Sequence, residues 1–257
     1  AVSESELNGD PVLALPGFRI GKSGMEKFHD ASLRGVAGTS QLEVNAVGRV
    51  IRELSRQEGQ PGRDLTLTID IGLQQYAQDR LKEEKSAAAV VMDVHTGGIY
   101  SMASNPSYDP NLFTTGINAE TWEDLLSDPT TPLTNKVVAG QYAPGSTFKM
   151  LVALAALDSG IVGPRHTVFC PGHMDLGDHR FHCWKKGGHG TLDLVGALKH
   201  SCDTFFYDLA RRIGIDRIHD MAKKFGMGQR TQLDLPSERP GLIPSREWKQ
   251  ANLGKSW

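Results

Sequence analysis

Apolar and polar positions follow two different periods between residues 64 and 103. Strict alternation over residues 64–70 is typical of a half-buried strand, whereas apolar side chains return at helical spacing over residues 71–81. Two β-rich runs follow at residues 87–94 and 98–103, on either side of a His-Thr-Gly-Gly turn sequence. The pattern therefore predicts a strand, a helix and a β-hairpin, in this order.

The pattern upstream is weaker and predicts a small, extended module. Residues 1–60 are polar and glycine-rich, with one helical period over residues 24–33 and one alternating stretch over residues 42–51. A Gly-Gln-Pro-Gly sequence at residues 59–62 then interrupts the chain, so we expect a domain boundary near residue 61.

The pattern downstream predicts an excursion followed by helices. Residues 105–135 are rich in Pro, Asp, Thr and Asn, which favours irregular structure. A Pro-Gly-Ser signal then opens a helix that we expect over residues 144–157. Three further helical periods cover residues 192–199, 204–213 and 215–225. Strands and helices mix without an internal repeat, so we expect an α+β fold.

Composition narrows the class of protein. The 257 residues carry 28 basic and 30 acidic side chains, so the chain is nearly neutral and we expect no nucleic-acid partner. Hydrophobic residues make up 39% and charged residues 23%, which excludes a wholly disordered or coiled-coil chain. The longest apolar stretches fall far short of the roughly 18 residues of a membrane span, so we expect the chain as given to be soluble.

One Ser-x-x-Lys sequence occurs in the chain, from Ser146 to Lys149, at the start of an expected helix. Helical i, i+3 spacing puts the hydroxyl and the amine on one face. A serine hydroxyl is a poor nucleophile near neutral pH, so a neighbouring amine that accepts its proton would activate it. Taken alone, the pattern also fits a helix-capping serine followed by an exposed lysine.

Further sequences accompany this pair. Ser201-Cys-Asp203 follows downstream, which gives the order Ser-x-x-Lys, then Ser-x-Asn, with Asp in place of Asn. Together with Tyr142-Ala-Pro-Gly before the serine, these residues resemble the motifs of the class B penicillin-binding transpeptidases. An Asp at the third position of the second motif resembles the elongation-type branch of that family. Five upstream segments also resemble this branch, at residues 21–24, 43–45, 48–51, 67–70 and 105–111. The resemblance therefore covers most of residues 17–257.

The resemblance implies a role for each residue of the site. Ser146 would be the acylated nucleophile, Lys149 its general base, and Ser201 a proton relay between the lysine and the leaving amine. Asp203 would contact substrate. An ionised carboxylate beside Lys149 would weaken the lysine as a base. We therefore expect either an Asp203 carboxylate that points elsewhere or a slow acylation.

The resemblance also implies an architecture. Residues 61–257 would form the N-terminal part of a transpeptidase domain of the penicillin-binding and β-lactamase type, an antiparallel sheet flanked by helices. Residues 1–60 would be part of an N-terminal pedestal, a dimerisation-type module. No Lys-[Ser/Thr]-Gly sequence, the third catalytic element of this family, follows Ser201, and residues 254–257 echo it only superficially. We therefore expect the C-terminal strands, missing from this chain, to belong to the remainder of a longer polypeptide.

The implied function is peptidoglycan D,D-transpeptidation in cell elongation and cell-shape maintenance. A serine acyl-enzyme would cross-link stem peptides, with D,D-carboxypeptidase activity as a side reaction, and β-lactams would trap it. The implied location is the periplasm, with an inner-membrane anchor absent from this chain, and the implied partners are a SEDS-type glycosyltransferase and other elongation-complex proteins. Two alternatives stay open: a non-catalytic scaffold that regulates a glycan polymerase, and a β-lactam-hydrolysing or β-lactam-sensing relative.

All three cysteines and six of the nine histidines lie within residues 166–202. A set of three cysteines and one histidine suits a tetrahedral structural zinc ion. Glycines around His189 would let the chain turn this side chain back to a metal, whereas His182 beside Cys183 would point away. The ligands that we favour are Cys170, Cys183, His189 and Cys202.

The resemblance points the same way, since some members of the elongation-type branch carry zinc in this loop. As a ligand, Cys202 would brace the catalytic loop from behind. A disulfide between Cys170 and Cys183, with Cys202 as a small buried residue, is the alternative.

Overall fold

The computed structural model describes residues 2–7, 9, 11–14, 18–114 and 116–255. The chain divides into two compact units. The first unit comprises Ala1–Gly140 with Gln232–Glu238, and the second comprises Gln141–Thr231 with Arg239–Trp257. The boundary expected near residue 61 lies inside the first unit and stays a prediction.

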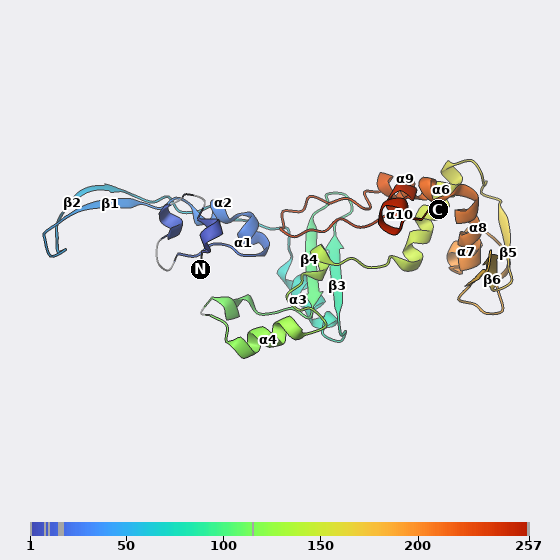
Figure 1. Ribbon diagram of the computed structural model, residues 1–257, viewed down its shortest axis with the longest axis horizontal. Coiled ribbons are helices and arrows are strands. Elements are labelled where there is room, and N and C mark those ends of the chain that lie inside the picture. Colours follow the sequence, from blue (N-terminus) through green and yellow to red (C-terminus); the bar gives the residue numbers. More distant parts are fainter. Residues whose placement is uncertain (1, 8, 10, 15–17, 115, 256–257) are drawn as a thin grey trace. The chain divides into compact units, whose positions relative to one another are not determined.

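The N-terminal part of the first unit contains short helices and a two-stranded ribbon (Figure 1). The expected helical period over residues 24–33 forms two short helices separated by His29. The alternating stretch spans the turn of the ribbon, where the Asn45 side chain accepts hydrogen bonds from the backbone N–H groups of Val47 and Arg49. The elements are η1 Glu4–Glu6, η2 Pro11–Ala14, α1 Gly24–Phe28, α2 Asp30–Arg34, β1 Thr39–Val44 and β2 Val50–Gln57.

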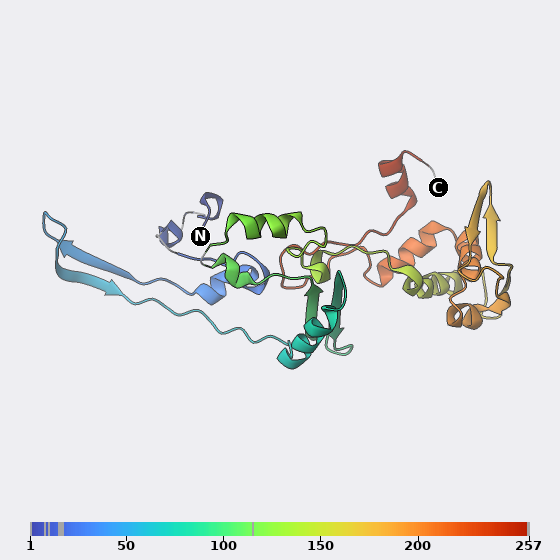
Figure 2. The same ribbon diagram turned by 90° about the horizontal axis from the view of Figure 1, so that it is seen from below.

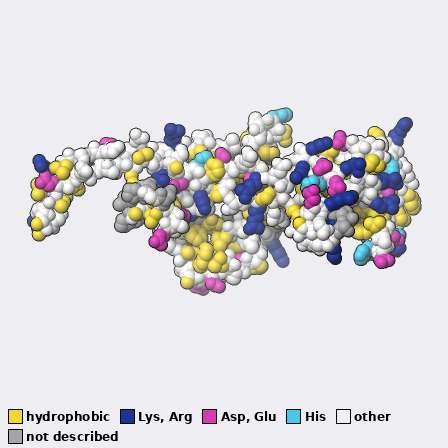
Figure 3. Space-filling model, turned by 45° about the horizontal axis from the view of Figure 1, so that its top comes forward, with side chains coloured by type: hydrophobic (Ala, Val, Ile, Leu, Met, Phe, Trp, Pro, Cys, Tyr) yellow, Lys and Arg dark blue, Asp and Glu magenta, His cyan; other side chains and the backbone are white. Residues whose placement is uncertain are grey.

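The antiparallel pair β1–β2 leaves its side chains exposed to solvent. Every residue of β2 is exposed, and all but one of β1 are exposed. Hydrophobic side chains are exposed beside charged ones on this ribbon, which lies at the left of Figure 3. The ribbon is therefore held by its backbone ladder and turn rather than by a hydrophobic core of its own.

Residues 64–70 are not a strand, and the prediction of one there was wrong. The segment is extended beside β4 (Ile99–Asn105), where the Asp70 N–H donates to the Tyr100 carbonyl at 2.9 Å. The Thr68 hydroxyl donates to the Ile99 carbonyl at 2.7 Å. No regular backbone ladder forms between this segment and β4.

The predicted helix and hairpin that follow are confirmed, as α3 Ile71–Leu81, β3 Ala87–Met92 and β4. The Asp70 side chain caps α3 by accepting a hydrogen bond from the Leu73 N–H. Helix α3 is joined to the sheet through two glutamines one turn apart. Gln74 donates to the Met102 carbonyl, and Gln78 donates to the carbonyl of Ser104.

The excursion at residues 105–135 is irregular only in part. It contains η3 Pro110–Phe113 and α4 Ala119–Ser127, and α5 Lys136–Ala139 follows it. The Asn118 side chain caps α4, and Trp122 packs edge-on against Phe113 at a ring-centre distance of 6.1 Å. A capping residue and one aromatic contact thus form a helix that the polar composition did not predict.

Lys136 ties the excursion to the body of the first unit. Only 4% of this residue is exposed, and its ammonium donates to the Thr131 carbonyl at 3.1 Å and to the Pro106 carbonyl at 3.3 Å. Burial lowers the pKa of the Lys136 ammonium, although the Asp128 charge counteracts this. One side chain therefore fastens both ends of the excursion.

The second unit packs helices around one core and carries two small antiparallel strand pairs, of which one is a hairpin (Figure 2). The helix expected from residue 144 begins as the 3₁₀ turn η4 and continues as α6, and the three later helices are confirmed within one or two residues. Alanines of α6 (Ala153 and Ala156) are buried in the core with Phe205 and Leu209 of α8. The elements are η4 Gly145–Phe148, α6 Lys149–Asp158, β5 Thr167–Cys170, β6 His173–Leu176, β7 His179–His182, β8 Gly190–Asp193, α7 Leu194–Lys199, α8 Asp203–Ile213, α9 Ile215–Lys224 and α10 Arg246–Leu253.

Candidate functional site

Ser146 and Lys149 lie where the 3₁₀ turn η4 passes into α6. Ser146 is exposed, and Lys149 is the first residue of α6, with a side chain that is 13% exposed. Gly145 precedes the serine with φ of +57°, a left-handed conformation that favours glycine. The local turn thus presents the hydroxyl at the surface and directs the lysine inward.

The Ser201 hydroxyl lies between the two. It donates to the Ser146 hydroxyl oxygen at 2.9 Å and accepts a hydrogen bond from the Lys149 ammonium at 2.9 Å. The same ammonium donates to the Ser201 carbonyl at 2.8 Å. A proton can therefore pass between Ser146 and Lys149 through one intervening hydroxyl.

The loop that presents Ser201 has a strained backbone. Ser201 has φ of +49°, which a residue with a side chain adopts at a cost of the order of 1–3 kcal/mol. The Cys202 N–H donates to the Ala197 carbonyl in α7 and fixes this turn between α7 and α8. Cys202 is the residue that precedes α8, and no side-chain hydrogen bond caps this end of the helix.

Asp203 points at Lys149. One carboxylate oxygen is 2.5 Å from the ammonium nitrogen, and the other accepts a hydrogen bond from the Trp184 N–H at 2.9 Å. Burial opposes ionisation, but the hydrogen bonds from Lys149 and Trp184 outweigh it and hold the pKa of the Asp203 carboxyl below its usual range. Of the two expectations for this carboxylate, orientation away from the lysine is therefore the wrong one.

Trp184 is a contact that the sequence pattern does not reveal. Its backbone N–H holds Asp203, and its indole N–H donates to the His200 carbonyl at 3.0 Å. Because every residue except proline has a backbone N–H, the residue type could not have indicated this donor. The one sequence feature that connects Trp184 with the site is its position directly after Cys183, in the cysteine-rich loop.

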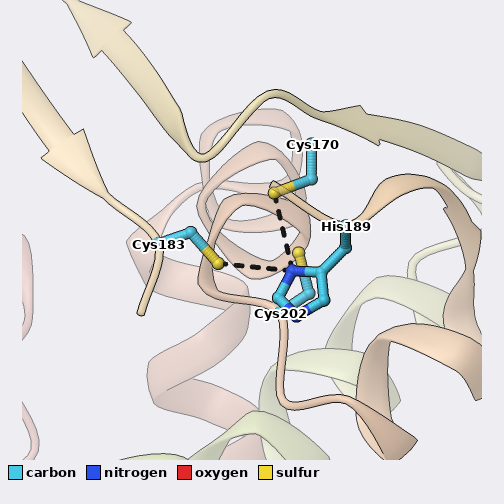
Figure 4. Close-up of side chains that lie close together, drawn as sticks. All are labelled: Cys170, Cys183, His189 and Cys202. Carbon is cyan, nitrogen blue, oxygen red and sulfur yellow. Dashed lines mark hydrogen bonds between the residues drawn. The ribbon is translucent and has the colours of Figure 1, made fainter. Parts of the chain in front are cut away.

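The predicted metal ligands lie together in the second unit (Figure 4). Their four donor atoms are within 4.8 Å of one another, and the three cysteines are buried free thiols. His189 Nδ1 lies 3.7 Å from Cys170 Sγ and 3.5 Å from Cys183 Sγ. The backbone strengthens the cluster, because the His189 N–H donates to the Cys170 carbonyl. The four residues are Cys170, Cys183, His189 and Cys202.

This donor set fits zinc. Bond lengths of 2.3 Å to sulfur and about 2.05 Å to nitrogen in a tetrahedron separate the two ligand atoms by about 3.6 Å. The observed sulfur–nitrogen separations of 3.7 and 3.5 Å agree with that value. Burial raises the pKa of the Cys202 thiol to about 12. A divalent cation would relieve the repulsion among three buried thiolates.

Two other sequence features, a tryptophan and a second Ser-x-Asp sequence, lie in the first unit. Trp122 packs in the excursion of the first unit. The Ser-x-Asp sequence at residues 107–109 precedes η3 in the same unit, and its aspartate caps that turn. The echo of the third catalytic element ends at Ser256 and Trp257, which lie outside the described residues.

The chain matches two protein families. Residues 87–256 match the penicillin binding protein transpeptidase domain, and residues 2–67 match the penicillin-binding protein dimerisation domain. The chain is 45% identical over 255 residues to the peptidoglycan D,D-transpeptidase MrdA of Escherichia coli K12, a match that covers 98% of this chain and 40% of the relative. The MrdA protein of Acinetobacter baumannii is 42% identical over 240 residues, which cover 93% of this chain and 36% of that protein.

Solved structures give the same likeness. A complex of penicillin-binding protein 2 and MreC from Helicobacter pylori matches with a TM-score of 0.90 and 31% identity, over 99% of this chain and 48% of that one. Penicillin-binding protein 2 of Pseudomonas aeruginosa in complex with WCK 5153 matches with a TM-score of 0.84 and 40% identity, over 100% of this chain and 53% of that one. The chain thus spans 36% to 53% of the length of these relatives.

Proposed function

The chain belongs to the penicillin-binding protein transpeptidase family, and from this premise we propose that it supplies the nucleophile of an elongation-type peptidoglycan D,D-transpeptidase. The observation that carries the proposal is the hydrogen-bonded series from Ser146 through Ser201 to Lys149, with both links at 2.9 Å. The MrdA relatives, which are named peptidoglycan D,D-transpeptidases, support the substrate class.

The reaction uses these residues in two stages. Ser146 Oγ attacks the carbonyl carbon between the last two D-alanines of a stem pentapeptide while its proton passes through Ser201 to Lys149, which accepts it as the neutral amine. The proton then returns to the leaving amine, D-alanine departs, and an ester joins the peptide to Ser146. An amine of a second stem attacks this ester, which releases the cross-linked peptide and restores the serine.

Asp203 adjusts this relay. Its carboxylate holds the Lys149 ammonium at 2.5 Å, and the Trp184 N–H holds the carboxylate. In this arrangement the lysine nitrogen is fixed beside Ser201, which keeps the relay aligned before a substrate arrives. The ion pair also favours the charged lysine, so it opposes proton uptake by the base and slows acylation.

We infer a structural zinc ion at the cysteine cluster, where it would fasten β5, β7 and the loop before α8 to one point. When bound, zinc supplies fixed tetrahedral geometry and no step of the reaction. Cys202 lies between Ser201 and Asp203 in the chain, so a fixed Cys202 limits the movement of both.

The wider setting is also part of the proposal. We place the chain in a periplasmic protein anchored to the inner membrane; among the described residues, no helix has the length and apolar character needed to cross one. The likeness to penicillin-binding protein 2 in complex with MreC, and to a peptidoglycan synthase complex, supports partners in the elongation machinery. A SEDS-type glycosyltransferase is the partner that the resemblance to the elongation branch implies.

Covalent labelling tests the proposal. Benzylpenicillin should add one penicilloyl group to Ser146 of the intact protein, detected by mass spectrometry and peptide mapping, and Ser146→Ala should remove the adduct. Ser107→Ala, in the other Ser-x-Asp sequence, is the matched control and should label fully. Absence of an adduct in the intact wild-type protein would favour a scaffold, and rapid release of penicilloate would favour a β-lactam hydrolase.

A further inference from the structure

The turn that presents Ser201 is the C-terminal end of α7, where His200 follows the last helical residue. The Ser201 N–H donates to the Leu198 carbonyl at 3.1 Å, and the Cys202 N–H donates to the Ala197 carbonyl at 2.9 Å. Two such backbone hydrogen bonds around a left-handed residue form the Schellman ending of a helix. Ser201, with φ of +49°, thus occupies the position that glycine usually takes.

The carbonyl group directly before Ser201 has a side-chain partner. Helix endings leave their last carbonyls without a partner inside the helix. The His200 carbonyl accepts a hydrogen bond from the indole N–H of Trp184 at 3.0 Å. This carbonyl belongs to the peptide group that joins His200 to Ser201, and the orientation of that group sets the φ angle of Ser201. The indole N–H therefore restrains the turn at the point where Ser201 enters it.

The same tryptophan also holds the residue on the other side of the turn. The Trp184 N–H donates to one carboxylate oxygen of Asp203 at 2.9 Å, and the other oxygen accepts from the Lys149 ammonium. Trp184 thus contacts the segment 200–203 both before and after Ser201.

Core packing does not account for the position of the indole, because Trp184 is 65% exposed. Its ring meets the His189 imidazole edge-on at a ring-centre distance of 5.4 Å. Trp184 also follows Cys183 directly in the chain, so its main chain is tied to the cysteine cluster. The indole is therefore held by the cluster on one side and holds the Ser201 turn on the other.

We propose that Trp184 is a positioning residue of the relay, whose indole N–H keeps Ser201 in the left-handed turn that directs its hydroxyl to Ser146. A serine in this conformation is strained, and such a conformation persists only where the surroundings hold it. The inference rests on the proposed transpeptidase function, because that function makes the Ser201 hydroxyl a relay. The indole acts through this hydroxyl and not on the substrate.

Trp184→Phe tests the role of the indole, since it keeps an aromatic ring and the main-chain N–H but removes the side-chain donor. Acylation of the intact protein by benzylpenicillin should slow about three- to tenfold, the effect of one hydrogen bond. The loss should fall on the acylation step and not on the noncovalent affinity for the penicillin. Trp122→Phe, at a ring that is 39% exposed in the first unit, is the matched control and should acylate at the wild-type rate.

A double variant separates positioning from a merely structural role. Adding Trp184→Phe to Ser201→Ala should leave the residual acylation rate of Ser201→Ala unchanged, because the hydroxyl that the indole positions is gone. A general loss of folding would instead slow acylation by the same factor in both backgrounds. Such equal slowing, or a wild-type rate in Trp184→Phe alone, would overturn the proposal.

A measurement without catalysis separates this inference from the proposed function. His200-Ser201 is the one His-Ser pair in the sequence, so its peptide group can be observed by nuclear magnetic resonance after labelling with carbon-13 at histidine carbonyls and nitrogen-15 at serine. The resonance that Ser201→Ala removes is assigned to this pair. Its carbonyl component should move upfield in Trp184→Phe, through loss of the hydrogen bond, and stay in place in Trp122→Phe.

The two readouts together distinguish the possible failures. An upfield shift in a protein that benzylpenicillin does not acylate would reject the transpeptidase and retain the hold of Trp184 on the turn. An unchanged carbonyl resonance in Trp184→Phe would reject the positioning role, even where Ser146 is acylated.

Discussion

At the scale of single residues, Ser201 has the most demanding position in the site. Its left-handed backbone directs one hydroxyl to Ser146 and its carbonyl to Lys149. The hydroxyl is the one link of the relay that another side chain cannot supply from the same place. Its contribution is therefore separable from that of the nucleophile.

Ser201→Ala should slow acylation by benzylpenicillin by about 10²–10⁴, because general acid–base catalysis contributes a factor of this size. Stopped-flow measurement of the penicilloyl adduct gives the rate. Ser107→Ala should acylate at the wild-type rate. A Ser201→Ala protein that also acylates at that rate would show that Lys149 acts on Ser146 without a relay.

Asp208 of α8 makes a second testable contribution. Burial opposes its ionisation, but the Arg212 hydrogen bond and charge, with His166 and Arg211, keep the pKa of this carboxyl below its usual range. A carboxyl with a lower pKa in the folded state adds stability above its unfolded pKa, near 4, and loses that stability as pH falls through the folded value.

Asp208→Asn should therefore destabilise the protein at pH 7 by about 1–3 kcal/mol, through loss of charged hydrogen bonds. The difference in free energy of unfolding should shrink as pH is lowered from 4 towards 2. Denaturant titrations across this range measure it, with the exposed Asp220→Asn of α9 as a control. A difference that stays constant with pH would mean that the Asp208 charge does not stabilise the fold.

At the scale of elements, the cysteine cluster brings together the end of β5, the residue that follows β7 and the loop between α7 and α8. One zinc ion per chain is the expected stoichiometry by elemental analysis of the purified protein. Removal of the metal by a chelator, or Cys202→Ser, should lower the midpoint of thermal unfolding, since a loss of 1 kcal/mol lowers it by about 2–4 °C in a cooperative protein of this size. Acylation of Ser146 should slow with it.

A chelated protein with an unchanged unfolding midpoint would contradict a structural role for the metal. Zinc addition after chelation is the matched control and should restore both the midpoint and the acylation rate. A disulfide between Cys170 and Cys183 predicts the opposite pattern: sensitivity to a reductant and indifference to a chelator.

The excursion at residues 105–135 depends on one buried lysine. Lys136→Met should leave the Thr131 and Pro106 carbonyls without their donor and destabilise the first unit by about 1–3 kcal/mol. Urea unfolding measures this loss, and Lys85→Met at an exposed position should be neutral. Equal stability of the two variants would show that water replaces the ammonium at no cost.

Sequence patterns correctly predicted those helices and strands that are determined by the residues of their own segment. Helix α3 and the β3–β4 hairpin follow from apolar periodicity and a turn sequence, and the i, i+3 spacing placed Lys149 one turn from Ser146. Residues 64–70 alternate as a strand does, yet they form no strand, and Thr68 contacts the Ile99 carbonyl through its side chain. An alternating pattern predicts which side chains face the core, but it does not predict the hydrogen-bond partner of the backbone.

The candidate site shows the same division. Residue types and chain order pointed to the serines, the lysine and the cysteine cluster, which the structure brings together in the second unit. The direction of the Asp203 carboxylate depends on a turn at Ser201, which lies 52 residues after Lys149, and on the main-chain N–H of Trp184. Neither has a pattern in the sequence.

At the scale of the whole molecule, each of the two compact units is built from two segments that are not consecutive in the sequence. The first unit takes its main part from residues 1–140 and a short return from residues 232–238. Within that return, Asp234 lies 3.9 Å from His29, and Leu233 and Leu235 line a pocket with Met25.

The short return has a consequence for how the protein can be divided. A fragment cut at residue 140 lacks the seven residues 232–238 that belong with it, and the complementary fragment carries them with no surface to cover. Limited proteolysis between the units should thus leave two fragments that stay associated. Separate expression of either half should yield insoluble or aggregated protein. Cooperative unfolding is the corollary, because the polypeptide crosses from one unit to the other three times.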